Sequence, residues 1–409
     1  MPPPEMGAPV DPAIDEFRAE VRAFLTTAMA PELVDGHADP DDLTGLDETF
    51  ERALHREAGA RGYLALTLPR EYGGGGLPPE YRAVFGREAA ATDAPVIDTA
   101  LTLGGAPILA HGSDEQRRSL LPAMARGELT LCIAYTEPGA GSDLGAIGTT
   151  ARRADVDDPG SDWVIRGTKS LVTGAHKSDW CLLVARTALD PDAPARHAMS
   201  MFLVDLRVTP GVSVHRQRTA NTWTLGSIEL ADARVPATAL LGEEGRGFAQ
   251  MAAALADERS GFFWVGWAEQ RLADLLEHVR VVGPDNLGLP PAAARDTLAR
   301  AWIDVALARR LARNVVDVQA RGGDATVVAA MSKVFVTELL QRIASAGIAL
   351  LGPAGLLTAT LFGPVDPEAP LRGRFAYDCV ERLHPTISVG SNQIQRDVLA
   401  HRGLGLPTA

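Results

Sequence analysis

Ala134-Tyr135-Thr136-Glu137-Pro138-Gly139-Ala140-Gly141-Ser142-Asp143 follows a short apolar run and interleaves glycines with hydroxyl side chains. Gly139 and Gly141 can adopt positive φ and let a planar ligand approach the main chain. Thr136 and Ser142 offer hydroxyl groups that form hydrogen bonds from defined positions. The stretch therefore predicts a binding site for a flat ligand at the end of a strand. The alternative is a tight turn in which the closing aspartate binds local amides.

Two further segments lie in the order that one flavoprotein family uses. The first stretch and Lys169-Ser170-Leu171-Val172-Thr173-Gly174-Ala175 resemble the two flavin segments of the acyl-CoA dehydrogenase family, and Val389-Gly390-Ser391-Asn392-Gln393-Ile394-Gln395-Arg396 resembles its C-terminal cofactor segment. Leu68-Pro69-Arg70-Glu71-Tyr72-Gly73-Gly74 is similar to a loop of the family's first helical domain, and Leu404-Gly405-Leu406-Pro407 to the terminus of many bacterial members. Ordered matches over nearly the whole chain are more specific than one motif. The resemblance implies that FAD is the cofactor.

Hydrophobic spacing divides the chain into helical, β-rich and helical regions. We expect an α+β fold with an N-terminal α-helical domain (1–128), a middle β-barrel or sandwich domain (129–245) and a C-terminal four-helix bundle (246–409), which is the family's layout. A crevice where the bundle meets the β domain is the expected cofactor site. The expected helices include 50–60, 80–91, 115–126, 292–320 and 326–351, and the expected strands are 131–134, 163–166, 180–185, 200–204 and 226–230.

Composition favours a soluble cytoplasmic protein. The chain has 409 residues, 46% of them apolar, which suffices for two or three packed units. Its net charge of −13 disfavours binding to nucleic acid or to an anionic membrane. The N-terminus lacks an export signal pattern, and no uninterrupted apolar run reaches the roughly 18 residues of a membrane span. Cys132, Cys181 and Cys379 lack CxxC or zinc spacing, so we expect buried, reduced thiols and no metal site.

Other patterns carry no function here. The glycines at 139–144 fail the GxGxxG spacing of a nicotinamide fold, and those at 73–76 lack the Lys of a phosphate loop. No HExxH motif or nucleophile elbow occurs. Arg372, Arg374 and Arg382 are expected on a solvated helix surface.

The reaction implied by the resemblance needs one desolvated carboxylate. An acyl thioester is oxidised when its α-proton is removed as the β-hydrogen leaves as hydride to the flavin. Many family members carry this base just before the Gly of the C-terminal segment, but Val389 stands there and cannot accept a proton. Other members, similar to isovaleryl-CoA dehydrogenase, take the base from the first long helix after the β domain, where this chain has Asp257-Glu258-Arg259. Glu258 is therefore the candidate base and Asp257 the fallback; the alternative is an ordinary acidic residue on a solvated helix face.

The resemblance also implies the groups that contact the flavin ring. Thr136 is assigned to the pyrimidine side and Thr173 to a hydrogen bond near N5, where donors stabilise the reduced ring. Leu171 is a departure, because well-known members carry Trp there; its smaller side chain either makes room for a bulkier substrate or changes solvent access. The other residues assigned to FAD here are Ile133, Tyr135, Gly141 and Ser142.

The other end of FAD is assigned to the C-terminal region. Ser391 and Gln393 are expected to hold the adenine or ribose, and Gly352 to provide a main-chain diphosphate contact from a neighbouring subunit. The family's Arg-x-x-Phe-Gly after the first bundle helix is replaced by Gly283-Pro284-Asp285-Asn286-Leu287-Gly288, and Arg295 is only a weak substitute. This departure leaves open both the affinity for FAD and the usual homotetramer.

We therefore expect FAD-dependent α,β-dehydrogenation of an acyl thioester carried by CoA or, as a variant, by a carrier protein. Ser142 and Arg259 are assigned to the substrate, and an electron-transfer flavoprotein or similar acceptor takes the electrons. The pattern is most like actinobacterial members that act on sterol side chains or in polyketide pathways. A homo-oligomer, dimer or tetramer, is expected, with a heteromer as the alternative. Two other functions stay open: a non-catalytic partner subunit that completes the FAD site of a related chain, and a flavin monooxygenase or oxidase on the same fold.

Overall fold

The chain forms two compact units. The structure, a computed structural model, describes residues 12–39, 42–96, 100–188, 195–220, 224–251, 261–357, 361–362 and 366–407. The sheet unit comprises Arg52–Gly76 and Asp98–Glu258, and the helical unit comprises Met1–Glu51, Leu77–Ile97 and Arg259–Ala409. Each unit has a hydrophobic core of its own.

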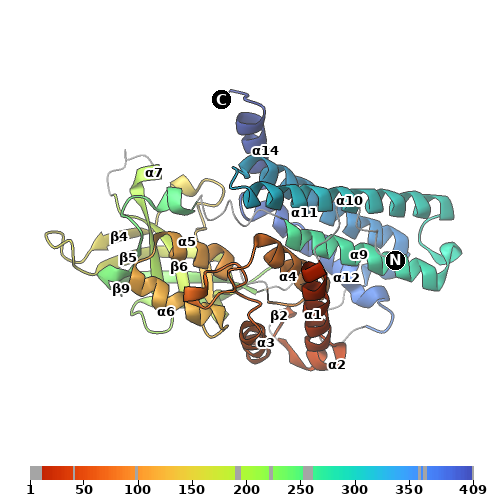
Figure 1. Ribbon diagram of the computed structural model, residues 1–409, viewed down its shortest axis with the longest axis horizontal. Coiled ribbons are helices and arrows are strands. Elements are labelled where there is room, and N and C mark those ends of the chain that lie inside the picture. The colour runs from red at the N-terminus through yellow and green to blue at the C-terminus, as the bar shows by residue number, and fades with distance from the viewer. Residues whose placement is uncertain are drawn as a thin grey trace. The chain divides into compact units, whose positions relative to one another are not determined.

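An eight-stranded sheet forms the centre of the sheet unit, in the order β10-β7-β6-β4-β5-β9-β8 with β3 paired to β6. Its strands β4, β5, β6 and β9 are labelled in Figure 1. β3 runs parallel to β6, whereas the long pairs β6/β7, β5/β9 and β8/β9 are antiparallel. Trp163, Ile165, Phe202 and Ile228 lie in its core. The strands are β3 (Leu131–Ala134), β4 (Thr150–Arg153), β5 (Trp163–Thr173), β6 (Trp180–Arg186), β7 (Met199–Asp205), β8 (Val212–Arg218), β9 (Thr224–Val235) and β10 (Leu240–Leu241).

Short helices complete the sheet unit. At the start of α6, the Ser113 hydroxyl accepts from the Gln116 amide at 3.1 Å and the Gln116 side chain accepts from the Ser113 amide at 2.9 Å, which is a capping box. The side-chain Nε2 of Gln116 also donates to the carbonyls of Thr238 and Leu240, so this cap ties α6 to β10. The helical elements are most of α3 (Glu48–Ala60), η2 (Arg70–Tyr72), η3 (Ala100–Gly105), α5 (Ala106–His111), α6 (Asp114–Ala125), η4 (Leu144–Ala146), η5 (Ala175–Lys177), α7 (Ala195–Ala198) and η6 (Ala237–Ala239).

Three long helices, α9, α10 and α11, pack together in the helical unit, with α12 and α14 against α11 and α4 against α9 (Figure 1). The buried side chains of α10 are mostly small, including Ala301, Ala308 and Ala312, so its neighbours approach closely. Gly347 lets α12 approach α11, because a Cβ there would lie 2.0 Å from the Phe375 ring. The helices are α1 (Pro12–Ala28), α2 (Pro31–Val34), α4 (Pro79–Ala91), α9 (Phe262–Val282), α10 (Pro291–Ala320), α11 (Thr326–Leu351), α12 (Arg374–Glu381), α13 (His384–Ile387) and α14 (Asn392–Val398).

Shorter elements join these helices: η1 (Asp35–His37), β1 (Ala38–Asp39), β2 (Asp42–Leu46), η7 (Pro284–Asn286), η8 (Gly352–Leu356), η9 (Pro370–Gly373) and η10 (Leu399–Gly403). Among the described residues, the stretch Thr326–Leu356 is long and apolar enough to cross a membrane by length and composition, and half of its most apolar window is buried. α11 packs against α9, α10, α12 and α14. Its apolar composition is accounted for by this position in the bundle.

A buried cluster of charges links α4, α9 and α12. The Arg271 side chain is 2% exposed and donates to Asp93 at 3.0 Å and to Asp378 at 2.6 Å. Arg382 pairs with Asp378 at 2.9 Å and stacks on the Trp267 ring at 3.6 Å. Burial alone raises the pKa of Asp93, but Arg271 and the neighbouring arginines lower it below its usual value.

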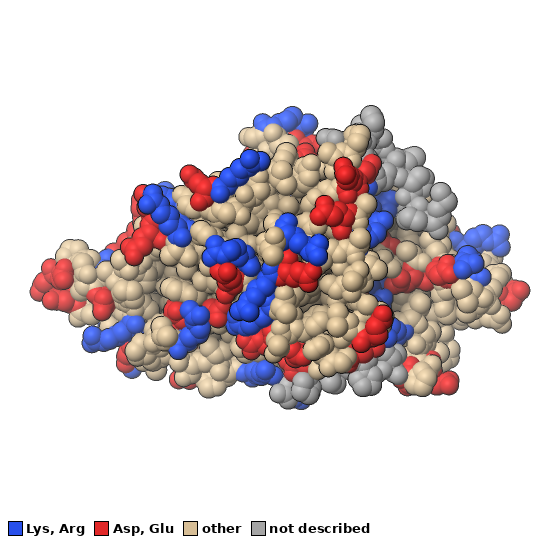
Figure 2. Space-filling view, turned by 60° about the horizontal axis from the view of Figure 1, so that its bottom comes forward, with Lys and Arg blue, Asp and Glu red and all other residues tan. Residues whose placement is uncertain are grey.

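This cluster overturns the expectation that the three arginines of the α12 region lie on a solvated surface. The Arg382 side chain is 3% exposed, Arg374 lies 3.6 Å from Asp93, and Arg372 pairs with Asp35 at 2.7 Å. The prediction was wrong because Asp35 and Asp93, which pair with Arg372 and Arg374, are remote in sequence. Arg382 pairs with Asp378 one helical turn away, and it is buried because it also packs on the remote Trp267 ring. On the face in Figure 2, acidic and basic side chains are interspersed, so charges of either sign form no broad patch there.

Candidate functional site

The first sequence motif forms a tight turn at the end of β3. The Glu137 amide donates to the Ala140 carbonyl at 2.9 Å, and the Ala140 amide donates back to Glu137 at 3.1 Å. Gly139 and Gly141 do not adopt positive φ, so that expectation was wrong. A Cβ on either residue would meet no atom within 4 Å among the described residues. The two glycines therefore leave the main chain bare toward open space rather than relieving a strained backbone.

Asp143 behaves as the alternative interpretation of this motif requires. Its carboxylate accepts from the Gly145 amide at 3.1 Å and caps η4. The capped turn and the bare glycines coexist, because the cap lies beyond Gly141 and leaves it exposed. The turn chemistry therefore does not compete with ligand binding at this motif.

The second motif contains a bulge in β5. The pairing of β5 with β9 shifts between Lys169 and Val172. At the bulge, Leu171 adopts φ of 55°, which is unusual for a residue other than glycine, and its side chain is 59% exposed. The Leu171 amide donates to the Gln217 side chain at 3.2 Å. An exposed apolar side chain in a strained conformation is typical of a ligand site.

The outward face of the sheet continues from this bulge. Thr173 is the register partner of Leu225 on β9, and Leu225 is the partner of Gln217 on β8. Paired residues of a sheet project to the same face, so Gln217 lies in the same row as Thr173. Gln217 was not predicted as a site residue, and only its strand pairing reveals this position.

A buried ion pair joins the two motifs. Lys169 is fully buried, and its ammonium group lies 2.7 Å from the Glu137 carboxylate. The same carboxylate accepts from the amides of Gly148 at 2.6 Å and Thr149 at 3.1 Å. The Ser170 amide donates to the Thr136 carbonyl at 2.9 Å. Glu137 and Lys169 carry no role in the sequence analysis, although Lys169 follows Ile165 and Gly167 on the inward face of β5 and could have been noticed there.

Burial and pairing have opposite effects on the pKa values of Lys169 and Glu137. Burial lowers the pKa of Lys169 below its usual value, although the Glu137 carboxylate opposes that change. Burial raises the pKa of Glu137, but Lys169 and the amides of the 148–149 turn lower it overall. Each partner therefore favours the ionised form of the other and opposes the effect of burial.

The C-terminal motif lies in the helical unit and contains two successive left-handed residues, Val389 with φ of 55° and Gly390 with φ of 78°. The Ser391 hydroxyl accepts from the Ile394 amide at 3.4 Å and caps α14. Gln393 is exposed on the first turn of that helix. The Gln395 side chain, which is buried, donates to the Gly390 carbonyl at 3.3 Å and steadies the turn.

Asn392 anchors this motif to α11. Its side-chain oxygen accepts from the Lys333 ammonium at 2.7 Å, and both residues are buried. Its amide nitrogen donates to the Glu338 carboxylate at 3.1 Å, which also pairs with Arg396 at 2.6 Å. Neither Asn392 nor Lys333 was assigned a role from the sequence.

Gly352 ends α11 with φ of 64° and packs against Gly288. The Gly288 amide donates to the Leu350 carbonyl at 2.8 Å, and a Cβ on Gly288 would lie 2.5 Å from the Gly352 Cα. The loop that replaces the family's Arg-x-x-Phe-Gly therefore lies directly on the predicted diphosphate contact. The predicted base Glu258, the fallback Asp257 and the predicted substrate residue Arg259 lie outside the described residues.

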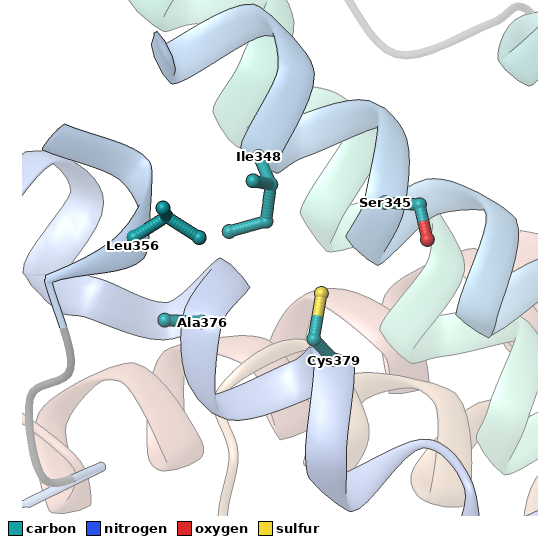
Figure 3. Close-up of a pocket in the computed structure, with 5 residues that line it drawn as sticks. All are labelled: Ser345, Ile348, Leu356, Ala376 and Cys379. Carbon is teal, nitrogen blue, oxygen red and sulfur yellow. The ribbon is translucent and has the colours of Figure 1, made fainter. Parts of the chain in front are cut away.

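A cavity of about 390 Å³ opens between α11, η8 and α12 in the helical unit (Figure 3). It is lined by Ser345, Ile348, Leu356, Ala376 and Cys379, none of which is a predicted site residue. Burial raises the pKa of the Cys379 thiol, which keeps it protonated. Cys132 and Cys181 are buried and free, as predicted, and are register partners on β3 and β6.

Family models match the chain over nearly its whole length. The acyl-CoA dehydrogenase N-terminal domain matches residues 11–128, the middle domain residues 132–232 and the C-terminal domain residues 245–404. The chain belongs to the acyl-CoA dehydrogenase family. It is therefore an FAD-dependent oxidoreductase that acts on CH–CH bonds of acyl-CoA substrates, and the fold predicted from the sequence is confirmed.

Individual relatives agree with the family assignment. Acyl-CoA dehydrogenase FadE26 of Mycobacterium tuberculosis is 29% identical over 97% of this chain and 98% of its own length. Acyl-CoA dehydrogenase IpdE1 of the same organism is 31% identical over 96% and 98%. Among solved structures, the Tcur3481-Tcur3483 steroid ACAD matches with a TM-score of 0.87 and 26% identity over 99% of this chain and all of that chain. The ChsE4-ChsE5 complex from Mycobacterium tuberculosis matches with a TM-score of 0.85 and 29% identity over the same shares.

The sheet-unit residues fit the flavin of an acyl-CoA dehydrogenase. Among the described residues, no hydrogen bond engages the side-chain hydroxyls of Thr136, Ser142 and Thr173. Gly141 leaves open space beside its main chain, and the Leu171 side chain projects outward. A planar ring with polar edges needs this combination of hydroxyl donors, bare backbone and apolar surface.

Proposed function

We propose that this chain oxidises the α,β-bond of a bulky acyl-CoA thioester, with Glu258 as the base that takes the α-proton. The observation that carries the proposal is that the two flavin motifs are joined by the bond from the Ser170 amide to the Thr136 carbonyl and together offer unengaged hydroxyls, bare glycines and an exposed Leu171. The steroid ACAD among its structural neighbours supports a large substrate. A polyketide carrier protein in place of CoA is a variant of the same proposal.

FAD, when bound, supplies the acceptor for the β-hydrogen and its electron pair. The hydroxyls of Thr136 and Thr173 hold the electron-rich edge of the ring, and main-chain groups of Ile133 and Tyr135 line it. Gly141 leaves its backbone accessible, and Ser142 contacts both cofactor and substrate. Ser391, Gln393 and Gly352 are proposed contacts for the adenine, ribose and diphosphate of a cofactor shared between subunits.

Glu258 is proposed as the base because Val389 removes the other usual position of the carboxylate. A base of this kind works when burial and an apolar acyl chain raise its pKa toward the working pH. Asp257 is the fallback, and Arg259 is proposed as a substrate contact. An electron-transfer flavoprotein or similar acceptor is proposed to reoxidise the cytoplasmic enzyme.

Leu171 supports a bulky substrate. Where well-known members carry a broad Trp ring, this chain places a smaller side chain on a strained bulge. Leucine leaves unfilled the volume that an indole would occupy, so a bulky acyl group can approach the ring edge. The strain itself indicates that the bulge is maintained by its surroundings, Gln217 among them, rather than by the preference of leucine.

A second candidate function is that of a partner subunit in a heteromer. Two observations favour it: Val389 lacks a carboxylate, and the Gly283–Gly288 region lacks the arginine that reaches a partner's FAD. Two structural neighbours are named as pairs of chains, Tcur3481-Tcur3483 and ChsE4-ChsE5. In this case a related chain would supply the missing contacts, and a homo-oligomer would hold incomplete sites.

The test replaces the proposed base. Glu258→Gln should keep bound FAD and abolish bleaching of the flavin absorbance by acyl-CoA, because the amide cannot take the α-proton. Asp257→Asn is the matched control and should bleach normally. Unchanged bleaching by Glu258→Gln would eliminate Glu258. A wild-type chain that binds FAD but bleaches only after a related chain is added would favour the partner-subunit function instead.

A further inference from the structure

Lys169 and Glu137 form a buried ion pair at the junction of the two flavin motifs. The lysine side chain is fully buried and the glutamate side chain is 9% exposed, with 2.7 Å between their charged atoms. Glu137 lies in the turn of the first motif, and Lys169 begins the bulge of the second. The pair therefore links the two segments that the proposed function assigns to the ring.

Its contacts reach the backbone that is proposed to face the flavin. The Lys169 ammonium lies 3.4 Å from the Tyr135 carbonyl, which it contacts as a donor. The next residue, Ser170, donates its amide to the Thr136 carbonyl at 2.9 Å. Through these contacts the pair fixes the positions of Tyr135 and Thr136 relative to the bulge that carries Leu171.

Stability alone does not explain a buried ion pair. Replacing such a pair by apolar side chains of similar volume is often neutral or stabilising, because both charges lose their hydration on burial. A buried pair beside a proposed redox site has a second consequence. Its two charges nearly cancel at a distance, so the ring experiences little net field while the loops stay fixed.

We propose that Lys169 and Glu137 are positioning residues for the flavin, and that their mutual neutrality sets the reduction potential of the bound ring. Removing one partner leaves the other charge beside the same backbone. An uncompensated lysine favours the electron-rich reduced flavin, whereas an uncompensated glutamate disfavours it. The inference rests on the proposed function, because it requires FAD at these two motifs.

The experiment measures the reduction potential and dissociation constant of FAD in the full-length protein. Glu137→Gln should raise the potential and Lys169→Met should lower it. Burial lowers the pKa of an unpaired lysine and raises that of an unpaired glutamate, so the first is measured near about pH 6, which favours the protonated lysine, and the second near about pH 8, which favours the ionised glutamate. The double variant should return toward the wild-type potential at both pH values. Each single variant should weaken FAD binding about tenfold or more.

A matched control is Arg52→Met, which breaks the pair between Arg52 and Asp179 in the same unit. Asp179 binds the Thr130 amide at 2.9 Å and contacts neither flavin motif in the described structure. This variant should lower stability without changing the flavin potential. If it moves the potential as far as Glu137→Gln does, the effect is structural and the proposal is overturned.

Two outcomes overturn the proposal directly. The single variants shift the potential in the same direction, or neither shifts it while FAD is bound. If Lys169→Met does not fold, the test compares the reduction potentials of Glu137→Gln and the double variant, because these two proteins differ only at Lys169. A wild-type chain that binds no FAD refutes both this inference and the proposed function. If acyl-CoA bleaches the wild-type chain, the proposed function stands, and the potentials of the variants then test this inference alone.

Discussion

Replacing Arg271 with methionine should destabilise the helical unit, because it leaves buried carboxylates without a main partner. Arg271 is 2% exposed and contacts Asp93 at 3.0 Å and Asp378 at 2.6 Å. Methionine keeps much of the unbranched side chain but removes the charge. α9 carries Arg271 and begins at Phe262, four residues after the proposed base, so this cluster also braces the helix nearest that base in sequence.

The size of the effect follows from what remains of the cluster. Removing one partner of a buried ion pair costs about 3–5 kcal/mol. Arg382 still pairs with Asp378 at 2.9 Å, and Arg374 remains 3.6 Å from Asp93. We therefore expect the lower end, a loss of about 3 kcal/mol in the free energy of unfolding. Urea titration followed by circular dichroism at pH 7 measures it.

The loss should shrink as the pH falls. In the wild type the pKa of Asp93 is lowered, so its contribution is present above its unfolded pKa and is lost only as the pH falls through the folded value. Without Arg271, only Arg374 and Arg382 oppose the effect of burial, so the pKa of this carboxyl rises relative to the wild type. The variant therefore has a lower free energy of unfolding at neutral pH and regains part of it as Asp93 takes up a proton. The difference in free energy of unfolding between the two proteins narrows from pH 7 toward about pH 5.

Arg300→Met is the matched control. Arg300 pairs with Asp296 on the surface of α10, with exposed fractions of 76% and 62%, and its loss should change stability by less than about 0.5 kcal/mol. Equal losses for the two variants, or a gap for Arg271→Met that stays constant between pH 7 and pH 5, would refute the assignment of a buried, pH-linked cluster.

Leu171→Trp should lower kcat/KM for bulky acyl-CoA substrates at least about tenfold more than for short ones, because the indole fills the space beside the bulge. A panel of acyl-CoA thioesters scored by flavin bleaching measures this difference. Equal losses for bulky and short substrates would refute Leu171 as a size determinant. Val389→Gly should raise the free energy of unfolding by about 1 kcal/mol, since glycine relieves the left-handed strain of a β-branched residue. A urea titration that shows a loss would indicate that the Val389 side chain contributes more by packing than its backbone costs.

Periodicity predicted the long elements because their burial follows their own sequence. The expected helix 326–351 coincides with α11 (Thr326–Leu351), and the expected strand 131–134 with β3. β8 (Val212–Arg218) was missed because it is an edge strand whose valines alternate with Ser213, His215 and Gln217 on the exposed face. Edge strands bury little, so their alternation carries a weak signal.

The sequence identified the motifs of the proposed site but not the residues that support them. The roles of Thr136 and Thr173 are implied by the family resemblance, and both lie on segments joined by the bond from the Ser170 amide to the Thr136 carbonyl. The partners that join them, Glu137 and Lys169, lie 32 residues apart, and sequence alone does not reveal that distance in space. The same reason hid the burial of Arg382: its i−4 neighbour Asp378 could be seen in the sequence, but the Trp267 ring that covers it comes from a remote helix.

The conformation of Val389 bears on where the base lies. A β-branched residue with positive φ costs about 1–3 kcal/mol, so its surroundings must impose that conformation. The turn is fixed by Gly390, by the Ser391 cap of α14 and by the buried bond between Lys333 and Asn392. None of these contacts needs a carboxylate at 389, so the turn serves to place α14 whether or not it carries the base. Loss of the acid at this position therefore leaves the cofactor motif intact, and the proton can be taken from the substrate by a residue on a different element.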